Sequence, residues 1–508
     1  MQQIIWSILA ITATLAFYAT PTSVVFSLEP QRDKVINVPG EAVYDIGDEP
    51  MRYIENDRVK LGLNLLLGGA ITYLEDKQTQ SGNMINCYDW GRQIQLSYYS
   101  GPNPYVGPNG EKPAPEWAGL GWNPIQSGDC GGFRSQVLSF ERISDSELFV
   151  RARPMLWPNH GVPAECVFEC RYKLTGNGFV LEATIVNNRT DKTQYQGRNQ
   201  ETPAVYTNAP WYKLVSYLGD KPFENEPLTT LVDKSDGKGW PWVIYYAPER
   251  WHALVNDKGY GLGVYQPCST EVSAGFHGGD AAKGQSLGPD STATGYIAPR
   301  ETTILDWNIK RTYRTTFIVG SIDEIRSTVY KLAKTDIVAT PDWIFQTDRQ
   351  NWCYLNATDE GYPIVNCLKL NLQSSKQAIA QSPVTFWKAQ DAMTLTIDAS
   401  FESEPNASGA EETATVCITP VSPADAIDYL QWSEGTKNKD QDRLEKSKTY
   451  PRLESIYVNI PVKYDGVRRE LKVDLSAYEN YKGAMKRVEI FFPKRDGKAT
   501  IYRIGFNK

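Results

Sequence analysis

The sequence lacks any dense cluster of basic residues, and its overall charge is mildly acidic. It holds 53 Lys+Arg against 60 Asp+Glu in 508 residues. Because phosphate backbones are bound by concentrated positive charge, this balance argues against a nucleic-acid-binding protein. Long periodic runs of Ala, Leu, Glu and Lys are also scarce, whereas Gly, Pro, Tyr and Trp are plentiful. That composition indicates a mostly-β chain with many turns.

Long apolar runs are absent except at the N-terminus. Residues 4–18 are apolar and are followed by the small and polar residues 19–23. This pattern predicts a signal peptide over residues 1–27, cleaved after Ala19 or after Ser27. No Lys or Arg precedes the apolar run, and an uncleaved anchor stays open, although Pro21 makes it a poor span. We therefore expect a secreted, periplasmic or cell-surface protein whose mature part has no membrane span.

The eight cysteines form no CxxC pair and show no zinc-finger spacing with histidine. Their even number is compatible with disulfides in an exported protein. Cys166 and Cys170 alternate with residues that include Glu169 and Arg171, so on a strand both thiols face the core. Free thiols or disulfide partners fit that position better than metal ligands. We expect no metal site and no cofactor, and we leave a structural calcium ion open.

The length of the chain predicts more than one domain, since single cores stop growing near roughly 250–300 residues. Dense strand signals predict a large antiparallel β-supersandwich, and a helix over residues 322–334, capped by Ser321, closes it. A second series of strands from Asp342 predicts a β-sandwich or jelly roll, in which the charged residues 434–448 form a loop or surface helix. The expected domains are residues 28–338 and 339–508. Predicted strands include residues 70–74, 92–99, 136–140, 166–174, 179–186, 303–309 and 313–319.

The stretch over residues 68–102 has the composition of a ligand surface. It joins two strand-like runs through a loop that collects amides, a carboxylate, a guanidinium and an indole. Sugar hydroxyls take polar partners of this kind, and the apolar face of a sugar ring stacks on an aromatic side chain. A solvated hairpin with a buried Trp is the alternative. The predicted binding residues in this stretch are Asn86, Trp90, Arg92 and Tyr99.

Two patches, GGAITYLEDKQTQSGNMIN at residues 68–86 and LEATIVN at residues 181–187, resemble the galactose-mutarotase-like β-supersandwich. That fold is shared by aldose epimerases and by domains of many glycosidases and polysaccharide lyases, so the resemblance implies a sugar ligand without fixing the reaction. The C-terminal block, with WCYLN at residues 352–356, is similar to the jelly-roll carbohydrate-binding modules appended to such enzymes. The family's active-site motif is not clear here, so the resemblance assigns no residue.

Local chemistry supplies the catalytic candidates. Among only three histidines, His160 is expected in an irregular loop beside Trp157, and His277 in a glycine-rich loop. His252 follows Trp251 at the start of a predicted strand and is interpreted as structural.

Carboxylates offer a rival mechanism, because glycosidases flank the scissile bond with two of them. Glu201, in the polar run RNQETPAVY that ends at Tyr206, and Asp89 are the carboxylates we select. The elimination reaction of a lyase would instead use Arg92 or Asn86 against the substrate carboxylate, with His160, Tyr99 or Tyr206 removing the proton.

Tryptophans complete the predicted binding surface. Residues 101–132 contain eight glycines and no clear strand pattern, which indicates a loop folded over the mouth of the sheet. Trp122 of this loop, Trp157 and Trp211 are the further substrate-binding candidates, and a structural lid with buried tryptophans is the alternative for the loop.

The sequence thus predicts an exported carbohydrate-active protein that cleaves a polysaccharide or oligosaccharide, as a glycoside hydrolase or a polysaccharide lyase. A non-catalytic glycan-binding protein and an aldose-epimerase-like enzyme are the alternatives. The glycan is the only partner expected.

Overall fold

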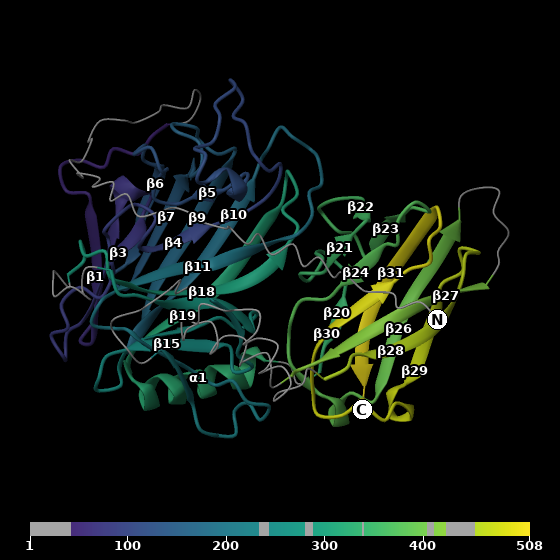
Figure 1. The fold of residues 1–508 in the computed structure, drawn as a ribbon. Helices are drawn as coiled ribbons and strands as arrows, with labels where there is room; N and C mark the ends of the chain where they lie inside the picture. Colours follow the sequence, from purple (N-terminus) through teal and green to yellow (C-terminus); the bar gives the residue numbers. More distant parts are fainter. Residues whose placement is uncertain are drawn as a thin grey trace.

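A computed structural model describes residues 42–232, 243–279, 288–337, 340–403, 411–422 and 453–507. Two β-rich bodies lie side by side, a larger one that ends with a helix and a smaller C-terminal one (Figure 1). The mostly-β fold class is confirmed. The predicted signal peptide and the charged residues 434–448 lie outside the described residues.

The first sheet of the larger body has ten described strands, mostly antiparallel neighbours in the order β1-β2-β3-β4-β11-β18-β17-β14, with β5 and β8 attached beside β4. Their bounds are β1 Met51–Glu55, β2 Val59–Asn64, β3 Ala70–Asp76, β4 Ile94–Ser97, β5 Pro124–Ile125, β8 Met155–Leu156, β11 Arg198–Asn208, β14 Val243–Tyr246, β17 Glu271–His277 and β18 Thr294–Thr303.

The second sheet has nine described strands in the order β13-β12-β15-β16-β19-β10-β9-β7-β6. Their bounds are β6 Gln136–Ser144, β7 Glu147–Arg153, β9 Cys166–Thr175, β10 Gly178–Asn187, β12 Lys213–Ser216, β13 Thr229–Val232, β15 Trp251–Val255, β16 Tyr260–Tyr265 and β19 Lys310–Ser321.

The core of the larger body lies between these two sheets. Strand β9 shows why, because its buried side chains alternate with exposed ones, as a half-buried strand requires. Cys166 and Cys170 are buried on the core side, as predicted. All eight cysteines lie in the described part of the chain, and all are free thiols there.

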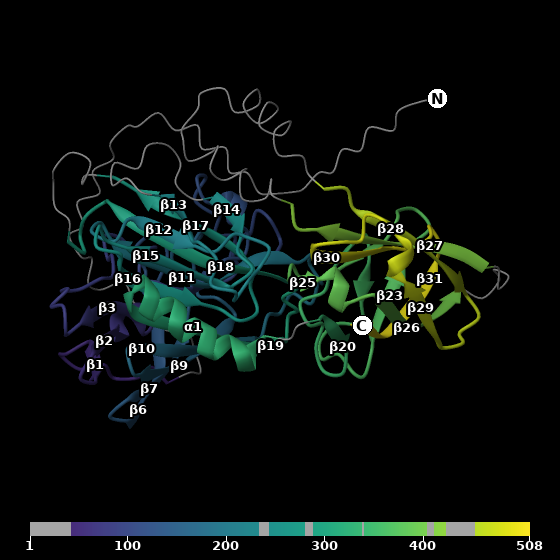
Figure 2. The same ribbon diagram turned by 90° about the horizontal axis from the view of Figure 1, so that it is seen from below.

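The predicted helix is confirmed as α1, Ile322–Asp336. Ser321 caps it, and its hydroxyl accepts from the Glu324 amide while the Glu324 carboxylate accepts from the Ser321 amide. Ile325 and Val329 of α1 pack on the outer side of the second sheet, against a cluster that includes Trp251. Figure 2 shows α1 lying beside the second sheet, with β15 and β16 next to it.

One predicted strand is wrong. Of residues 303–309, only Thr303 lies in a strand, as the end of β18, and residues 304–309 form the connection between β18 and β19. The strand in this region, β18, comes earlier in the chain and pairs with β11 and β17.

The smaller body is a β-sandwich of two six-stranded antiparallel sheets. One holds β20 Asp342–Ile344, β22 Thr358–Asp359, β23 Leu368–Leu372, β26 Thr394–Ser403, β29 Arg469–Asp474 and β31 Gly497–Asn507. The other holds β21 Cys353–Leu355, β24 Ile379–Gln381, β25 Trp387–Lys388, β27 Glu411–Pro420, β28 Ile456–Lys463 and β30 Ala484–Phe491. Trp352 and Trp387 are fully buried between them and therefore belong to the core.

Buried polar contacts join the two bodies. Arg349 of the smaller body forms an ion pair with Asp306 of the larger one, 2.6 Å from Nη1 to Oδ2, and a second with Asp359 of its own body. The Thr270 hydroxyl donates to the carbonyl of Val384 at 2.9 Å. The chain segments at the junction are therefore held by charge-assisted bonds rather than by a flexible linker alone.

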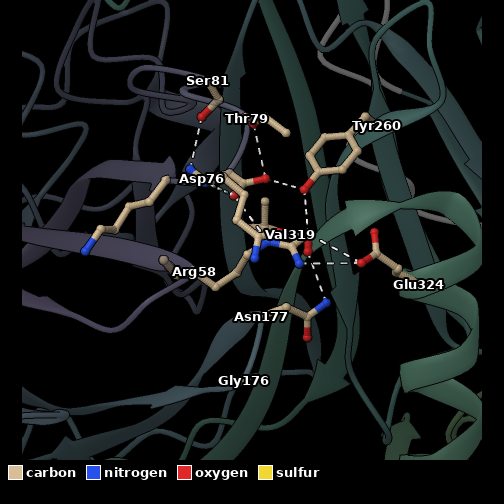
Figure 3. Close-up of polar contacts among 12 residues, drawn as sticks. Arg58, Asp76, Thr79, Ser81, Gly176, Asn177, Tyr260, Val319 and Glu324 are labelled. Atoms are coloured by element: carbon tan, nitrogen blue, oxygen red, sulfur yellow. Dashed lines mark hydrogen bonds and ion pairs between the residues drawn. The ribbon is translucent and has the colours of Figure 1, made fainter.

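A polar network centred on the buried Asp76 ties the first sheet to the helix (Figure 3). The fully buried carboxylate of Asp76 accepts from Arg58 Nε at 3.2 Å, from the Thr79 hydroxyl at 3.1 Å and from the Tyr260 hydroxyl. Arg58 also faces the carboxylate of Glu324, 3.5 Å from Nη2 to Oε1. The network therefore holds together β3, β16 and α1.

Within the described residues, no helix combines the length and the apolar character that crossing a bilayer requires.

Candidate active site

Two prolines shape the middle of the first sheet. The pairing of β11 with β18 is interrupted between Glu201 and Val205, and that of β11 with β4 between Glu201 and Ala204. Pro203 lies in this interruption and Pro299 lies across from it on β18. Proline has no amide hydrogen to donate, so both fit where the ladder is already broken. The bulge ends the regular ladder at Glu201, on the outer face of the sheet.

Glu201 lies at the centre of a cluster of tyrosines. The Tyr296 hydroxyl of β18 donates to Glu201 Oε1, and the Tyr99 phenol also interacts with the Glu201 carboxylate. The ring of Tyr206 lies against that of Tyr296, with centroids 4.8 Å apart. Glu201 is half-buried and forms no ion pair with any Lys or Arg of the described chain. The predicted residues Glu201, Tyr206 and Tyr99 are thus brought together.

The three phenols around Glu201 are held in their protonated form. Burial raises the pKa of Tyr99, Tyr206 and Tyr296 well above the ordinary value of a phenol, and the negative charge of Glu201 raises it further. A protonated phenol donates a hydrogen bond and does not act as a base. In this cluster, the carboxylate therefore accepts hydrogen bonds from the phenols.

The predicted pair Asp89 and Arg92 lies next to this cluster. Arg92 Nε is 3.1 Å from Asp89 Oδ2, and an Arg92 Nη1 hydrogen bond to the Thr292 carbonyl, at 2.9 Å, holds the guanidinium in place. Among the charges that act on the pKa of Tyr206, Asp89 raises it and Arg92 lowers it. The pair is therefore close enough to Tyr206 to belong to the same surface.

His277 lies on the same face of the sheet, although not in a loop as predicted. It ends β17, where it pairs with Thr294, and Gly275 two residues earlier pairs with Tyr296. Residues two apart on a strand share a face, so His277 and Tyr296 point to the same side. The glycine-rich residues around it predicted a loop, but the ladder with β18 makes this segment a strand.

A second group of predicted residues gathers around the turn at residues 129–133. His160 is exposed and lies against Gly131, close to the buried carboxylate of Asp129. Asp129 accepts from the amides of Gly131, at 2.8 Å, and Gly161, at 2.6 Å, which lower its pKa, although burial raises it more. In the described part of the chain, the contacts of His160 reach this turn and not Glu201.

Two half-buried tryptophans stand between the two groups. The ring of Trp157 lies 3.2 Å from the position that a Gly91 side chain would take, and it meets Trp117 edge-on at 5.7 Å. Trp90 is covered on one side by Arg134, 5.7 Å from its ring centroid. Both rings therefore pack partly against the protein and remain half-buried near Asp89.

Three predicted binding residues are corrected by their burial. Trp122 and Trp211 lie in the core of the larger body, at 0% and 6% exposure, so neither offers a ring to a sugar. Asn86 is also fully buried, and its amide nitrogen donates to the carbonyls of Ser291 and Ala293 at 2.9 and 3.2 Å. Its polar groups hold the backbone and are not available to a substrate.

Sequence reasoning missed Tyr296, the residue that donates to Glu201. Its strand, β18, does alternate, with Tyr296, Ala298 and Arg300 on one face and Ile297 and Glu301 on the other. Pro299 in the middle obscured that period, because proline normally argues against a central strand. The alternation was the signal that could have found it.

The described residues contain no group of three or more His, Cys, Asp or Glu side chains placed to hold a metal ion.

The sequence matches no protein-family model and no curated protein. Solved structures similar to the chain include a galactose mutarotase-like protein from Lactobacillus casei, 14% identical over 53% of this chain and 99% of that one, with a TM-score of 0.34. A galactose mutarotase related enzyme from Lactobacillus acidophilus is 13% identical over 53% and 97%, TM-score 0.34. The alpha-galactosidase from Lactobacillus brevis is 7% identical over 55% and 41%, TM-score 0.33. The first two belong to the class that residues 68–86 and 181–187 resemble.

Proposed function

We propose that the protein is an exported carbohydrate-active enzyme that cleaves a glycosidic bond of a polysaccharide or oligosaccharide, with Glu201 as the group that transfers the proton. The observation that carries this proposal is the state of Glu201. Its carboxylate accepts from the Tyr296 hydroxyl on the outer face of the sheet and has no cationic partner in the described chain. A half-buried carboxylate of this kind is not neutralised by an ion pair and stays available to a substrate.

The surroundings of Glu201 suit a sugar ring. The half-buried side chains of Tyr99 and Tyr206 supply hydroxyls and ring surface, as carbohydrate recognition requires, while Tyr296 is buried and holds Glu201. Beneath them, Ala204 of β11 and Ala298 of β18 form a small buried apolar cluster with Tyr296, which supports the half-buried Tyr206. We infer that the ring lies against the half-buried Tyr99 and Tyr206 with Glu201 at its edge.

Two reactions use a carboxylate in this way. In hydrolysis, the C–O bond to the leaving sugar breaks and the leaving oxygen takes a proton from a neighbouring phenol. A water molecule adds its oxygen to the anomeric carbon and gives a proton to Glu201, which returns it to the phenol. In elimination, a base removes the proton next to a uronate carboxylate, the C–O bond breaks as a double bond forms, and the leaving oxygen takes a proton from a neighbouring phenol, which the base then restores. Because the tyrosines remain protonated, Glu201 is the base in either case. The products distinguish the two reactions.

The test is a product assay with a matched pair of variants. The mature protein is incubated with neutral and uronic polysaccharides while reducing ends and the ultraviolet absorbance of unsaturated uronides are followed together. Glu201→Gln is expected to lower turnover by about 10²–10⁴-fold, the usual contribution of general acid–base catalysis. Glu182→Gln is the control, because Glu182 is an exposed carboxylate on β10 of the other sheet. If Glu201→Gln turns over like Glu182→Gln, the proposal is refuted.

A glycan-binding protein without catalysis is the second candidate, and the edge-on pair of Trp157 and Trp117 favours it. Half-buried indole rings bind sugars without any reaction. This candidate predicts that Trp157→Ala weakens retention on a polysaccharide gel while no product appears in either channel. Release of product by the wild-type protein would rule out the non-catalytic binding protein. An epimerase would instead interconvert anomers or epimers without increasing the number of reducing ends.

A further inference from the structure

A small polar cavity lies at the junction of the two bodies. Its volume is about 100 Å³, and it is lined from the larger body by Arg300, Glu271 and Thr302 and from the smaller body by Arg487, Gln381 and Asn351. Figure 2 shows β25 and β30 on the side of the smaller body that faces the larger one, and Arg487 belongs to β30. Neither body alone makes this cavity.

Two guanidinium groups of the cavity have no carboxylate partner. Neither Arg300 nor Arg487 forms an ion pair with any Asp or Glu of the described chain. The Nε atom of Arg487 is buried and has no hydrogen-bond acceptor among the described residues. Buried polar atoms are normally satisfied, so an orphaned charged donor facing a cavity needs an explanation.

The cavity is lined by the two guanidiniums of Arg300 and Arg487 and by two carboxylates, one of which is already ion-paired. Glu301 also lines it, but Glu301 is neutralised from behind by Arg311 and accepts from Asn351 at 3.2 Å. Glu271 is therefore the only lining carboxylate in the described chain without such a partner, against the two guanidiniums of Arg300 and Arg487. The balance favours an anion over a cation or a neutral group.

The cavity is also adjacent to the candidate active site. In the backbone ladder of the first sheet, Arg300 lies opposite Glu201 of β11 on one side and opposite Glu271 of β17 on the other. Paired residues of neighbouring strands share a face and lie roughly 5 Å apart. A volume of about 100 Å³ is below the roughly 300–1,000 Å³ of a pocket that encloses a whole ligand. It suits one charged substituent better than a whole sugar ring.

We propose that this cavity is an anion subsite that receives a carboxylate or sulfate group of the sugar chain, held by Arg300 and Arg487 while the ring lies at Glu201. The inference rests on the proposed function, which takes the ligand to be a sugar chain, and it narrows that ligand to an acidic glycan. It also gives the smaller body a part in the site, because Arg487 comes from it. A free inorganic anion would satisfy the same two guanidiniums.

Isothermal titration calorimetry distinguishes an acidic sugar chain from a free inorganic anion as the ligand of the cavity. A uronic oligosaccharide and its carboxyl-reduced neutral counterpart are titrated into Glu201→Gln, which does not consume them, and sodium sulfate is titrated separately at matched ionic strength. We expect the acidic oligosaccharide to bind at least about tenfold more tightly than the neutral one, as charge-assisted bonding predicts. Adding Arg487→Gln should abolish that difference and leave the neutral affinity unchanged.

Arg469→Gln is the matched control, since Arg469 is an exposed residue of β29 that pairs with Asp465 and does not line the cavity. It should preserve the preference for the acidic ligand. If Arg487→Gln does not fold, Arg487→Lys keeps the charge without the planar fork and should give an intermediate preference.

Equal affinity for the acidic and neutral oligosaccharides overturns the proposal. The same holds if sulfate binds through Arg487 while the acidic oligosaccharide shows no preference, because the cavity is then a site for a free anion. If neither oligosaccharide binds or is cleaved while sulfate still binds through Arg487, the proposed function fails and the anion affinity of the cavity stands. The failures of the two proposals are therefore distinguishable.

Discussion

Among the tyrosine–carboxylate hydrogen bonds of the larger body, those at Asp76 and at Glu201 differ in the charges around them. Asp76 is fully buried and accepts from Tyr260, but it also has Arg58 at 3.2 Å (Figure 3). Glu201 accepts from Tyr296 and has no cation paired with it in the described chain. In the first cluster the negative charge is neutralised and ties strands to a helix. In the second it faces phenols at a half-buried surface.

The difference distinguishes a carboxylate that stabilises the fold, Asp76, from the one that we propose to be catalytic, Glu201. Removing either partner of a buried carboxylate–arginine pair destabilises the fold, because the charge of the other partner is left uncompensated. A carboxylate among protonated phenols keeps its capacity to accept a proton from a substrate. Both clusters pair a carboxylate with a tyrosine hydroxyl, and they differ in the guanidinium of Arg58 and in the deeper burial of Asp76.

The largest effect on stability should come from Asp76→Asn. This change leaves the guanidinium of Arg58 without its buried partner, and we expect the free energy of unfolding to fall by about 3 kcal/mol, within the range for broken buried pairs. Urea unfolding followed by tryptophan fluorescence measures it. Turnover at a temperature where the variant is folded should remain that of the wild type. A variant as stable as the wild type would remove the distinction between the clusters.

Removing the hydroxyl of Tyr296 should lower catalysis, whereas removing the hydroxyl of Tyr260 should lower stability. Tyr296→Phe removes the hydrogen bond to Glu201 and is expected to lower kcat by about tenfold, equivalent to about 1.4 kcal/mol, with a small change in KM. Tyr260→Phe is its counterpart at Asp76 and should lower the unfolding free energy by about 1 kcal/mol without changing kcat. Steady-state kinetics and urea unfolding of both variants check this. Equal loss of kcat in the two would contradict the assignment.

A third buried group gives the larger body a pH dependence. His252 is fully buried, with the Tyr245 hydroxyl 3.0 Å from its Nδ1, and burial lowers its pKa to about 3. Its pKa is therefore lower in the folded than in the unfolded protein, where it is about 6.5. The stability that depends on neutral His252 is complete above pH 6.5 and is lost as the pH falls toward 3.

Replacing this histidine should flatten the pH profile of stability. Between pH 6 and 4, the wild type should lose about 1 kcal/mol per pH unit more than His252→Gln, the slope of one additional proton taken up on unfolding. Unfolding curves at several pH values give the difference. Parallel profiles would show that His252 is not held neutral by the fold.

The smallest expected effect concerns the helix that the Asp76 network reaches. Ser321→Ala removes one half of the capping box of α1, and we expect a loss of about 1 kcal/mol in unfolding free energy. Ser476→Ala is a suitable control, since Ser476 is an exposed serine of the smaller body whose hydroxyl contacts Asp474. A loss no greater than that of the control would contradict the role of the cap.

Features that depend on neighbouring residues were predictable from the sequence. Helix α1 was found because its cap, its acidic first turn and its apolar spacing lie within a few residues. The inward thiols of Cys166 and Cys170 were found because a strand has a period of two. Glu201 was selected because its polar run differs from the segments around it.

Features that depend on distant residues were not predictable. The position of Tyr296 is set by a ladder to Tyr206, 90 residues away in the chain, and by a bulge that accommodates two prolines. Trp122 and Trp211 have the same side chain as Trp157, and only the packing between the sheets separates core rings from half-buried ones. The cavity of Arg300 and Arg487 forms where two domains meet, which no local pattern records.

The most direct measurement compares the same chemical change at the two carboxylates. Glu201→Gln and Asp76→Asn each replace one carboxylate oxygen by an amide nitrogen. For both variants, kcat/KM is measured on the substrate that the wild type cleaves, and the unfolding free energy is measured separately. The account predicts that Glu201→Gln loses kcat/KM and keeps its stability, while Asp76→Asn loses stability and keeps kcat/KM. A Glu201→Gln variant that keeps the kcat/KM of the wild type would contradict it.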